Sequence, residues 1–324
     1  MNKVLRIGTR DSELAIYQAK KVQKAIKKLG KNSELKLIKS SGDKNLIQPI
    51  YKMGIQGVFT KALDTALINN KIDIAVHSLK DIPTKIPKEL LISAILKRES
   101  PYDSLVFSKK FKEFSNKSII GTGSLRRKAQ WLRKHPYHKI QNLRGNILTR
   151  IKKLDNSFWD GAIFSEAGIN RLKIKGVKYQ VLDWMIPSPG QGVIAICSKK
   201  EQLKLTRFLK KLNCEKTEIC VKIERNFLNI LEGGCKAPIA AFAKIKNKKI
   251  IFKSGLFSLD GSIAYFENQE IDFDKSKDCG INAAKHILKK GGGKLIEKIK
   301  NELEKWNCFL QKLFQKNLKT YWLK

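Results

Sequence analysis

Apolar strand-like segments alternate with amphipathic helical segments near the start of the chain, and this alternation limits the fold more than any other feature. Segments 4–8, 34–40 and 72–77 have the apolar character of buried strands. A helix is predicted from Asp11 or Ser12 to Gly30, because apolar residues recur three and four positions apart between them. Such alternation predicts an α/β protein whose sheets are rich in parallel strands joined by helices.

The same alternation begins again after about residue 100. Strand-like segments at 117–123 and 139–143 are each followed by a helical segment, the first of which is predicted to be capped by Ser124. A further strand and turn lie at 160–168. Ligands of parallel sheets bind at the carboxyl ends of the strands, where helix N-termini point. We therefore expect the functional residues in the turns that follow these strands.

The pattern changes near residue 215, where a long helix, three strands typical of antiparallel pairing and closing helices predict a small α+β domain. Segment 190–200 is predicted to be a strand that returns to the first sheet. The predicted domains are a discontinuous first α/β lobe, a second α/β lobe, the α+β domain and a basic amphipathic extension, at residues 1–97 with 191–213, 98–190, 214–302 and 303–324. Such an extension can touch a membrane surface, but we expect it to pack on its own protein.

Segment 41–57 contains one proline and three glycines and has little periodicity. It is long for a connection within a compact α/β unit, so it is predicted to be a mobile functional loop or lid.

The net charge of +37 invites comparison with nucleic-acid-binding proteins, since Lys and Arg number 66 against 29 acidic residues. Most of this charge comes from lysines that are spread along the whole chain. The same distribution arises when surface positions accumulate lysine through a coding bias, without any nucleic-acid partner. The arginines are few, 11 in all, and six of them fall between Arg126 and Arg171. A guanidinium binds carboxylate or phosphate through two parallel hydrogen bonds, which lysine cannot do. A small polyanionic ligand is therefore expected.

The six cysteines form no Cys-x-x-Cys pair and no cluster with the four histidines, so neither a metal site nor a disulfide framework is expected. No apolar run is long enough to cross a bilayer, and the first residues lack the apolar core of a secretory signal. We expect a cytoplasmic protein that is a monomer and has no stable membrane association.

The segment GTGSLRR (121–127) joins a glycine-rich turn, a predicted helix N-terminus and the pair Arg126 and Arg127. Each of these features favours an anion. Arg144 lies in the turn LRGN, and Arg150 and Arg171 follow nearby turns. Arg10 has the equivalent place after the first strand, so several arginines are expected to meet in one cleft.

The segment HSLKD (77–81) puts Lys80 and Asp81 just after an apolar strand. A carboxylate in a basic cleft is a candidate general acid or stabiliser of a substrate cation, although a helix cap or an ion pair with Lys80 is the commoner role.

The loop EGGCKAP (232–238) is predicted to expose Cys235 beside Lys236, whose positive charge favours the thiolate. A covalent role and a purely structural role are both open for this cysteine.

Taken together, these segments resemble the porphobilinogen deaminase (hydroxymethylbilane synthase) family. The resemblance extends from near the start to about residue 300 and is carried by several motifs in one order: HSLKDIP, GTGSLRR, LRGNILTRIKKLD, AGINRL, PSPGQG and ERNFLNILEGGCKAPI. It implies two lobes like those of periplasmic binding proteins, with the active cleft between them and a third domain that carries the cofactor.

The resemblance also implies an activity. Four porphobilinogen molecules would be joined head to tail, with loss of ammonia, onto one dipyrromethane cofactor held by Cys235 through a thioether, and water would then release hydroxymethylbilane. Asp81 would contact pyrrole nitrogens, help to protonate the leaving amine and stabilise the azafulvenium cation. The acetate and propionate groups would be bound by Arg10, Ser78, Lys80, Thr122, Ser124, Arg126, Arg127, Arg144, Arg150 and Arg171, with Lys52 acting from the lid.

Some positions depart from the family pattern. Gln56 stands where a second lid lysine is common, Gly123 replaces a frequent serine, and Ser165 and Glu166 occupy a turn that is usually smaller and apolar. Gln56 lacks the ammonium group of that lid contact, and Gly123 removes one hydroxyl donor but keeps the backbone N–H groups. The segment beyond about residue 303 has no clear counterpart.

Two other functions agree with parts of the sequence. A non-enzymatic two-lobed anion-binding protein would share the arginines, but it needs neither Cys235 on its Gly-Gly loop nor Asp81 in a basic cleft. A nucleic-acid-binding protein would expose aromatic side chains between basic ones, whereas these arginines lie in glycine turns that suit compact anions. We therefore expect a small-molecule substrate, porphobilinogen, and no nucleic acid.

Overall fold

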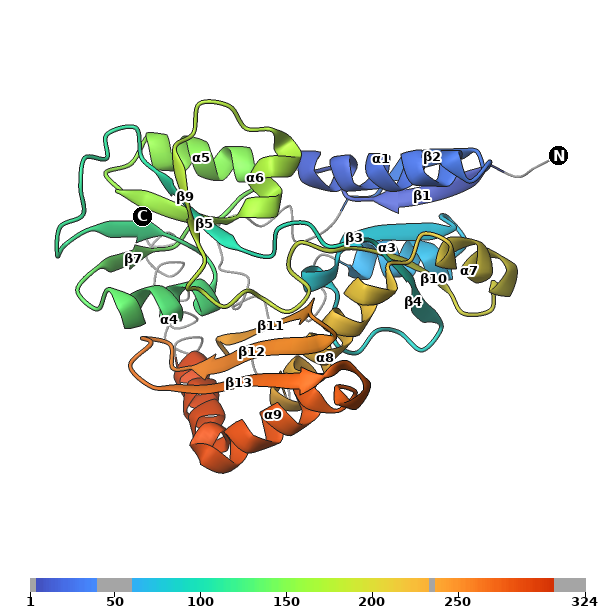
Figure 1. Ribbon diagram of the computed structural model, residues 1–324. Helices are drawn as coiled ribbons and strands as arrows, with labels where there is room; N and C mark the ends of the chain where they lie inside the picture. Colours follow the sequence, from blue (N-terminus) through green and yellow to red (C-terminus); the bar gives the residue numbers. More distant parts are fainter. Residues whose placement is uncertain (1–3, 40–59, 233–236, 306–324) are drawn as a thin grey trace, which may run out of the picture.

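The computed structural model describes residues 4–39, 60–232 and 237–305. Two α/β lobes lie side by side, and a three-stranded sheet with its helices packs below them (Figure 1). The first lobe is built on the sheet β2-β1-β3-β10-β4, the second on β7-β6-β8-β5-β9, and the third unit on β11-β12-β13. This mixed α/β architecture with a separate C-terminal unit confirms the predicted fold class.

In the first lobe, β1 (Leu5–Thr9) pairs in parallel with β2 (Ser33–Leu37) and β3 (Ile74–Ser78), while β10 (Ile194–Lys199) pairs antiparallel with β3 and β4 (Leu90–Ile95). Helices α1 (Glu13–Lys28) and α7 (Leu203–Lys210) bury apolar residues against one face of this sheet. Helix α3 (Lys61–Ile68) covers the other face. The apolar face that the sequence predicts for α1 is thus the face that packs on the sheet.

The second lobe repeats this plan. Strand β6 (Ile119–Gly121) pairs in parallel with β7 (Lys139–Gln141) and β8 (Gly161–Ser165), and β5 (Asp103–Phe107) pairs antiparallel with β8 and β9 (Tyr179–Leu182). Helix α4 (Leu125–Lys134) packs on one face, and α5 (Ile147–Asp155) and α6 (Glu166–Leu172) pack on the other. Each five-stranded sheet therefore has four strands that run in one direction and one antiparallel strand between two of them, β10 in the first lobe and β5 in the second.

The third unit has an antiparallel meander of β11 (Ile239–Lys246), β12 (Lys249–Phe257) and β13 (Ala264–Asp272). Helices α8 (Glu215–Glu232) and α9 (Cys279–Ile287), a π-helical turn η4 (Leu288–Gly292) and a helix over 293–305 form its apolar core with one face of the sheet. On the other face, Ala240 and Phe257 pack against Ala129 of α4. The sheet therefore rests on the second lobe.

Two segments connect the lobes, one before β5 and one before β10, and they lie against each other. Glu99 donates its backbone N–H to the carbonyl of Gly192 at 3.0 Å. Gly192 has a φ of +80°, and a Cβ there would lie 2.4 Å from the carbonyl oxygen of Ser100. Glycine is needed here for both its conformation and the close approach, so the two connections form one paired junction.

The described thiols agree with a packing role. Cys197, Cys214, Cys220 and Cys279 are free, and burial raises the pKa of Cys197 to about 12 and the pKa of Cys220 and Cys279 to about 11. Within residues 4–39, 60–232 and 237–305, no group of three or more metal-binding side chains is found. Over the same residues no helix combines the length and the apolar character that a membrane span requires.

Candidate active site

The N-terminus of α4 forms the centre of the candidate site. Ser124 caps the helix by accepting a hydrogen bond from the backbone N–H of Arg127, as the sequence predicts. Thr122, which is buried, accepts from the backbone N–H of Ser124 at 3.3 Å. The turn is therefore fixed by its own hydroxyl groups, and it directs the first residues of α4 toward the interior of the molecule.

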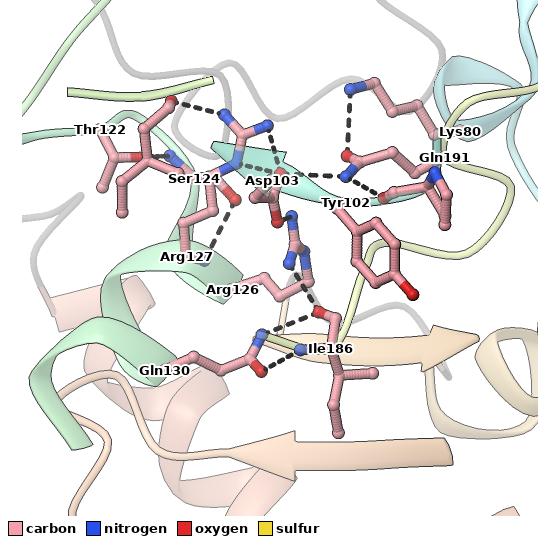
Figure 2. Close-up of polar contacts among 12 residues, drawn as sticks. Lys80, Tyr102, Asp103, Thr122, Ser124, Arg126, Arg127, Gln130, Ile186 and Gln191 are labelled. Atoms are coloured by element: carbon pink, nitrogen blue, oxygen red, sulfur yellow. Dashed lines mark hydrogen bonds and ion pairs between the residues drawn. The ribbon is translucent and has the colours of Figure 1, made fainter. Parts of the chain in front are cut away.

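Arg126 and Arg127 converge on one buried carboxylate, that of Asp103 at the start of β5 (Figure 2). Arg126 Nη2 donates to Asp103 Oδ2 at 2.7 Å, and Arg127 Nε donates to Oδ1 at 3.0 Å. Burial alone would raise the pKa of Asp103, but the two guanidinium groups outweigh it and lower that pKa to about 2. Asp103 is thus ionised and shared by both arginines.

Backbone carbonyls hold the same two side chains from other directions. Arg126 Nη1 donates to the carbonyl of Ile186 at 2.7 Å, and Arg127 Nη1 donates to the carbonyl of Ile163 at 2.9 Å. Gln130, one turn further along α4, also bonds Ile186 through both its amide oxygen and its amide nitrogen. Both arginines therefore have fixed positions.

Gln191 extends this network to the first lobe. Its amide nitrogen donates to Asp103 Oδ1 at 2.9 Å and to the carbonyl of Pro101 at 2.7 Å, and its amide oxygen accepts from Lys80 Nζ at 3.3 Å. Burial, followed by the charge of Arg127, lowers the pKa of Lys80 to about 8. The ammonium group of the first lobe and the guanidinium groups of the second thus lie in one network (Figure 2).

Asp81 lies beside this network, in the 3₁₀ turn η2 (Leu79–Asp81) that follows β3. The structure gives its carboxylate no hydrogen bond among the described residues, yet its charge acts on both Lys80 and Arg150. Arg150 donates from Nε to the carbonyl of Gly145 at 2.7 Å, and burial, with the charges of Arg127 and Arg144, lowers its pKa to about 10. The charge of Asp81 in the first lobe therefore acts on Arg150 of the second.

We call Lys80, Arg126, Arg127, Arg144 and Arg150 the cationic cluster; it has five cations, and two carboxylates, Asp81 and Asp103, lie within it. Arg144 is buried, and burial lowers its pKa. Positive charge held away from water favours anionic ligands strongly. The cluster can therefore bind carboxylates, with one carboxylic side chain, Asp81, left for proton transfer.

Two predicted residues of the first lobe lie at the strand ends of its sheet. Ser78 accepts a hydrogen bond from the buried amide of Gln18 at 2.8 Å. Arg10 follows β1, and its charge acts on His77, whose pKa is lowered to about 4 chiefly by burial. His77 is therefore neutral and buried, in agreement with a structural role.

Arg171 belongs to a different group of contacts. It donates from Nε to Glu99 Oε2 at 2.6 Å and from Nη2 to the carbonyl of Gly192 at 3.1 Å. Glu99 also accepts from Lys21 of α1. Arg171 thus binds the junction between the lobes, and no hydrogen bond or ion pair joins it to the cationic cluster in the described part of the chain.

Some predicted positions cannot be placed. Cys235, Lys52 and Gln56 lie outside the described residues. Of the departures that are described, Gly123 lies so close to the turn at 143–146 that a Cβ would be 2.7 Å from the carbonyl oxygen of Leu143. Glu166 begins α6 and accepts from the hydroxyl of Ser100, so it ties α6 to the junction between the lobes.

Comparison with known proteins identifies the relatives of this chain. The family described as "Porphobilinogen deaminase, dipyromethane cofactor binding domain" matches residues 5–207, and "Porphobilinogen deaminase, C-terminal domain" matches residues 218–289. The chain belongs to the porphobilinogen deaminase family. This confirms the resemblance found in the sequence, and with it the dipyrromethane cofactor for which the first of these domains is named.

Curated porphobilinogen deaminases match nearly the whole chain. The protein of Desulforamulus reducens is 35% identical over 93% of this chain and 99% of its own, and that of Buchnera aphidicola is 38% identical over 92% and 97%. A probable porphobilinogen deaminase of Methanocaldococcus jannaschii is 44% identical over 77% of this chain and 86% of its own. Among solved structures, an ancestral cationic amino acid solute-binding protein covers 64% of this chain at 15% identity and a TM-score of 0.42, too low a likeness to bear on function.

Sequence reasoning missed Asp103, Gln191 and Gln18 in this site. Asp103 opens an apolar strand after the polar segment 97–102, and a lone carboxylate at the start of such a strand was the available signal. Gln191 lies between two glycines in PSPGQG. A polar amide side chain flanked by turn-forming glycines was the available signal that this side chain makes a specific contact.

Proposed function

We propose that the chain is a transferase that joins four porphobilinogen molecules head to tail, with release of ammonia, on a dipyrromethane held by Cys235, and then hydrolyses the product to hydroxymethylbilane. The observation that carries this proposal is the cationic cluster, in which buried arginines of one lobe meet Lys80 and Asp81 of the other. Each pyrrole brings two carboxylates, so a growing chain of pyrroles needs several separate cations.

The charge of the cluster fits the cofactor. Among the described residues the cluster offers five cations, and the acetate and propionate groups of a dipyrromethane would pair with such cations. We assign this binding to Arg10, Ser78, Lys80, Thr122, Ser124, Arg126, Arg127, Arg144, Arg150 and Arg171, with Lys52 from the segment 41–57. The bound dipyrromethane supplies the pyrrole carbon to which the first porphobilinogen is joined.

Asp81 is the proposed catalytic acid. Lys80 and Arg150 lie within the reach of its charge, while its own oxygens have no hydrogen-bond donor among the described residues, which leaves them available to pyrrole N–H groups and to the leaving amine. When protonated, a carboxyl group so placed can give its proton to the amine, and the carboxylate that remains can stabilise the positive charge that develops on the substrate.

Attachment at Cys235 agrees with the packing that follows it in the chain. Ala240, five residues further on, packs against Ala129 of α4, two positions after Arg127. Ala241 donates its backbone N–H to the carbonyl of Pro187 at 3.0 Å. The beginning of β11 thus runs beside the element that carries Arg126 and Arg127.

We also propose the domain division 1–97 with 191–213, 98–190, 214–302 and 303–324, a cytoplasmic monomer, and no nucleic-acid partner. The alternative is a non-enzymatic two-lobed protein that binds a carboxylate-rich ligand. It shares the cationic cluster, but it gives no function to Asp81 or Cys235.

The intact mass of the purified protein tests the proposal. Protein made in a host that produces porphobilinogen is expected to carry an adduct the size of two pyrrole units, to give the colour of pyrroles with Ehrlich reagent, and to release ammonia from porphobilinogen. Cys235→Ser is expected to abolish the adduct. Cys214→Ser, at a described free cysteine, is the matched control and should keep it.

The outcomes separate the two functions. Unmodified wild-type protein that binds porphobilinogen without releasing ammonia would overturn the proposal in favour of the binding protein. An adduct that persists in Cys235→Ser would overturn the attachment site alone.

A further inference from the structure

Asp103 is a buried carboxylate that has no assigned part in the reaction. Its side chain is 0% exposed, and its oxygens accept from Arg126, Arg127 and Gln191. A ligand carboxylate cannot approach it, because it is enclosed and of like charge. Any effect of Asp103 on the reaction must therefore pass through the side chains that it binds.

Those side chains need a counter-charge to stay where they are. Arg126 and Arg127 are neighbours in sequence, both are buried, and both point to the same carboxylate. Two guanidinium groups removed from water repel each other more strongly than they would in solvent. The carboxylate of Asp103 offsets this repulsion by accepting a charge-assisted hydrogen bond from each guanidinium group. These two bonds fix the orientation of both groups and so determine where the remaining N–H groups of Arg126 and Arg127 point.

Gln191 passes the same constraint to the first lobe. Two of its three side-chain contacts are to acceptors, Asp103 and the Pro101 carbonyl, and the third is to the donor Lys80. This set fixes the orientation of the amide, since only its nitrogen can face the acceptors. Lys80 is thereby positioned with respect to the arginine pair, across the boundary between the lobes.

We propose that Asp103 is a positioning residue of the carboxylate-binding site: it holds Arg126 and Arg127 directly, and Lys80 through Gln191, in the arrangement that accepts the pyrrole carboxylates. This inference rests on the function proposed above. It gives Asp103 no contact with substrate and no proton to transfer.

Asp103→Asn tests this role, since it keeps the shape of the side chain, removes the charge and replaces the carboxylate oxygens that face the three donor side chains with one amide NH2 and one neutral oxygen. Asp73→Asn is the matched control. Asp73 is also buried and accepts three hydrogen bonds from one arginine, Arg6. Arg6 lies near the start of β1, whereas the candidate site lies beyond the end of that strand. Both variants are measured as holoenzyme for the KM and kcat with porphobilinogen, the cofactor adduct by mass, and the midpoint of urea unfolding.

We expect both variants to lower the unfolding midpoint, but only Asp103→Asn to raise KM, by a factor on the order of 10 to 100, as for a misplaced binding group. The effect should depend on the arginines, so Asp103→Asn should add little to Arg127→Gln when the two are combined. Equal KM values for the Asp103→Asn and Asp73→Asn proteins, or additive effects with Arg127→Gln, would overturn the inference.

A second variant covers the case in which Asp103→Asn does not fold. Gln191→Met removes only the amide that links Asp103 to Lys80, and it should raise KM without adding to the effect of Lys80→Met. Additive effects of these two substitutions would overturn the link. If Arg126→Gln and Arg127→Gln leave KM and the adduct unchanged, then the carboxylate site itself has been wrongly assigned, which is a separate result.

Discussion

Arg171 of α6 donates its Nε to Glu99 at 2.6 Å, and the same carboxylate accepts from Lys21 of α1. Glu99 lies in the segment that leads from the first sheet into β5, and Arg171 also donates to Gly192 in the returning segment. One carboxylate thus ties a helix of each lobe to the junction between them. A ligand carboxylate that binds Arg171 would have to compete with the carboxylate of Glu99.

Glu99→Gln is expected to weaken this junction in a pH-dependent way. The pKa of Glu99 is lowered because Lys21 and Arg171 outweigh the opposing effect of burial. A lowered folded-state pKa gives stability that is present above the unfolded value of 4.5 and is lost as pH falls through the folded value. Since Glu99 is 26% exposed, the loss should be only about 1 kcal/mol near neutral pH.

Urea unfolding of wild type and variant at about pH 7 and about pH 3 measures this difference. The exposed pair of Glu34 and Lys36 supplies the control Glu34→Gln, which should have little effect at either pH. A deficit of the same size at both pH values would show that the charge of Glu99 is not what stabilises the junction.

Asp81→Ala is expected to separate binding from turnover. All five cations of the cationic cluster remain, so the protein should still carry its adduct and any bound intermediates, while kcat falls by about 10² to 10⁴, as for loss of a general acid. Mass spectrometry and initial rates give the two quantities. The exposed Asp183→Asn should match wild type in both, and near-normal turnover of Asp81→Ala would remove the assigned role.

Lys80→Arg is expected to change the alkaline side of the activity profile. Burial, followed by the charge of Arg127, lowers the pKa of Lys80 to about 8, with Arg126 acting in the same direction and Asp81 and Asp103 opposing. The ammonium is therefore charged below that pH and is lost as pH rises, and bound carboxylates move the loss upward. We expect kcat/KM of wild type to decline above about pH 8 and that of the Lys80→Arg protein to stay level there, because arginine remains charged. The same alkaline decline in both proteins would exclude Lys80 as its cause.

Gly123→Ser, which restores the residue frequent in the family, is expected to destabilise this protein. A Cβ at 123 would lie 2.7 Å from a backbone oxygen of the neighbouring turn, so the turn that carries Arg144 must move, at a cost of about 1–3 kcal/mol. Gly293→Ala is the control, because its Cβ meets nothing closer than 4.0 Å in a helix, and it should be neutral or slightly stabilising. Unfolding midpoints decide between them, and equal midpoints would mean that the turn has room for the hydroxyl.

The elements with local signals could be predicted from the sequence. Ser124 caps α4 and Asn146 caps α5 through hydrogen bonds to residues three positions ahead, and the buried face of α1 follows its apolar spacing. Such contacts depend only on near neighbours in the chain, so a pattern of a few residues determines them.

Asp103 could not be found in this way, and the reason is the direction of β5. Alternation of strands and helices predicts parallel strands, and so directs attention to residues that follow a strand. Strand β5 runs antiparallel to β8, with Asp103 opposite Ser165, so its first residue lies at the edge where β8 ends. Its partners Arg126 and Gln191 are 23 and 88 positions away, and only the folded chain brings them together.

The place of β10 in the first sheet has a consequence for how this protein is made. β10 lies between β3 and β4, so the sheet that begins at residue 5 lacks an inner strand until residue 199 has left the ribosome. The whole second sheet, from β5 to β9, is synthesised in the meantime. The later lobe can therefore complete its fold first. Until β10 is made, β3 and β4 of the earlier lobe each have one unpaired edge, and such an exposed strand edge is a feature that chaperones protect from aggregation.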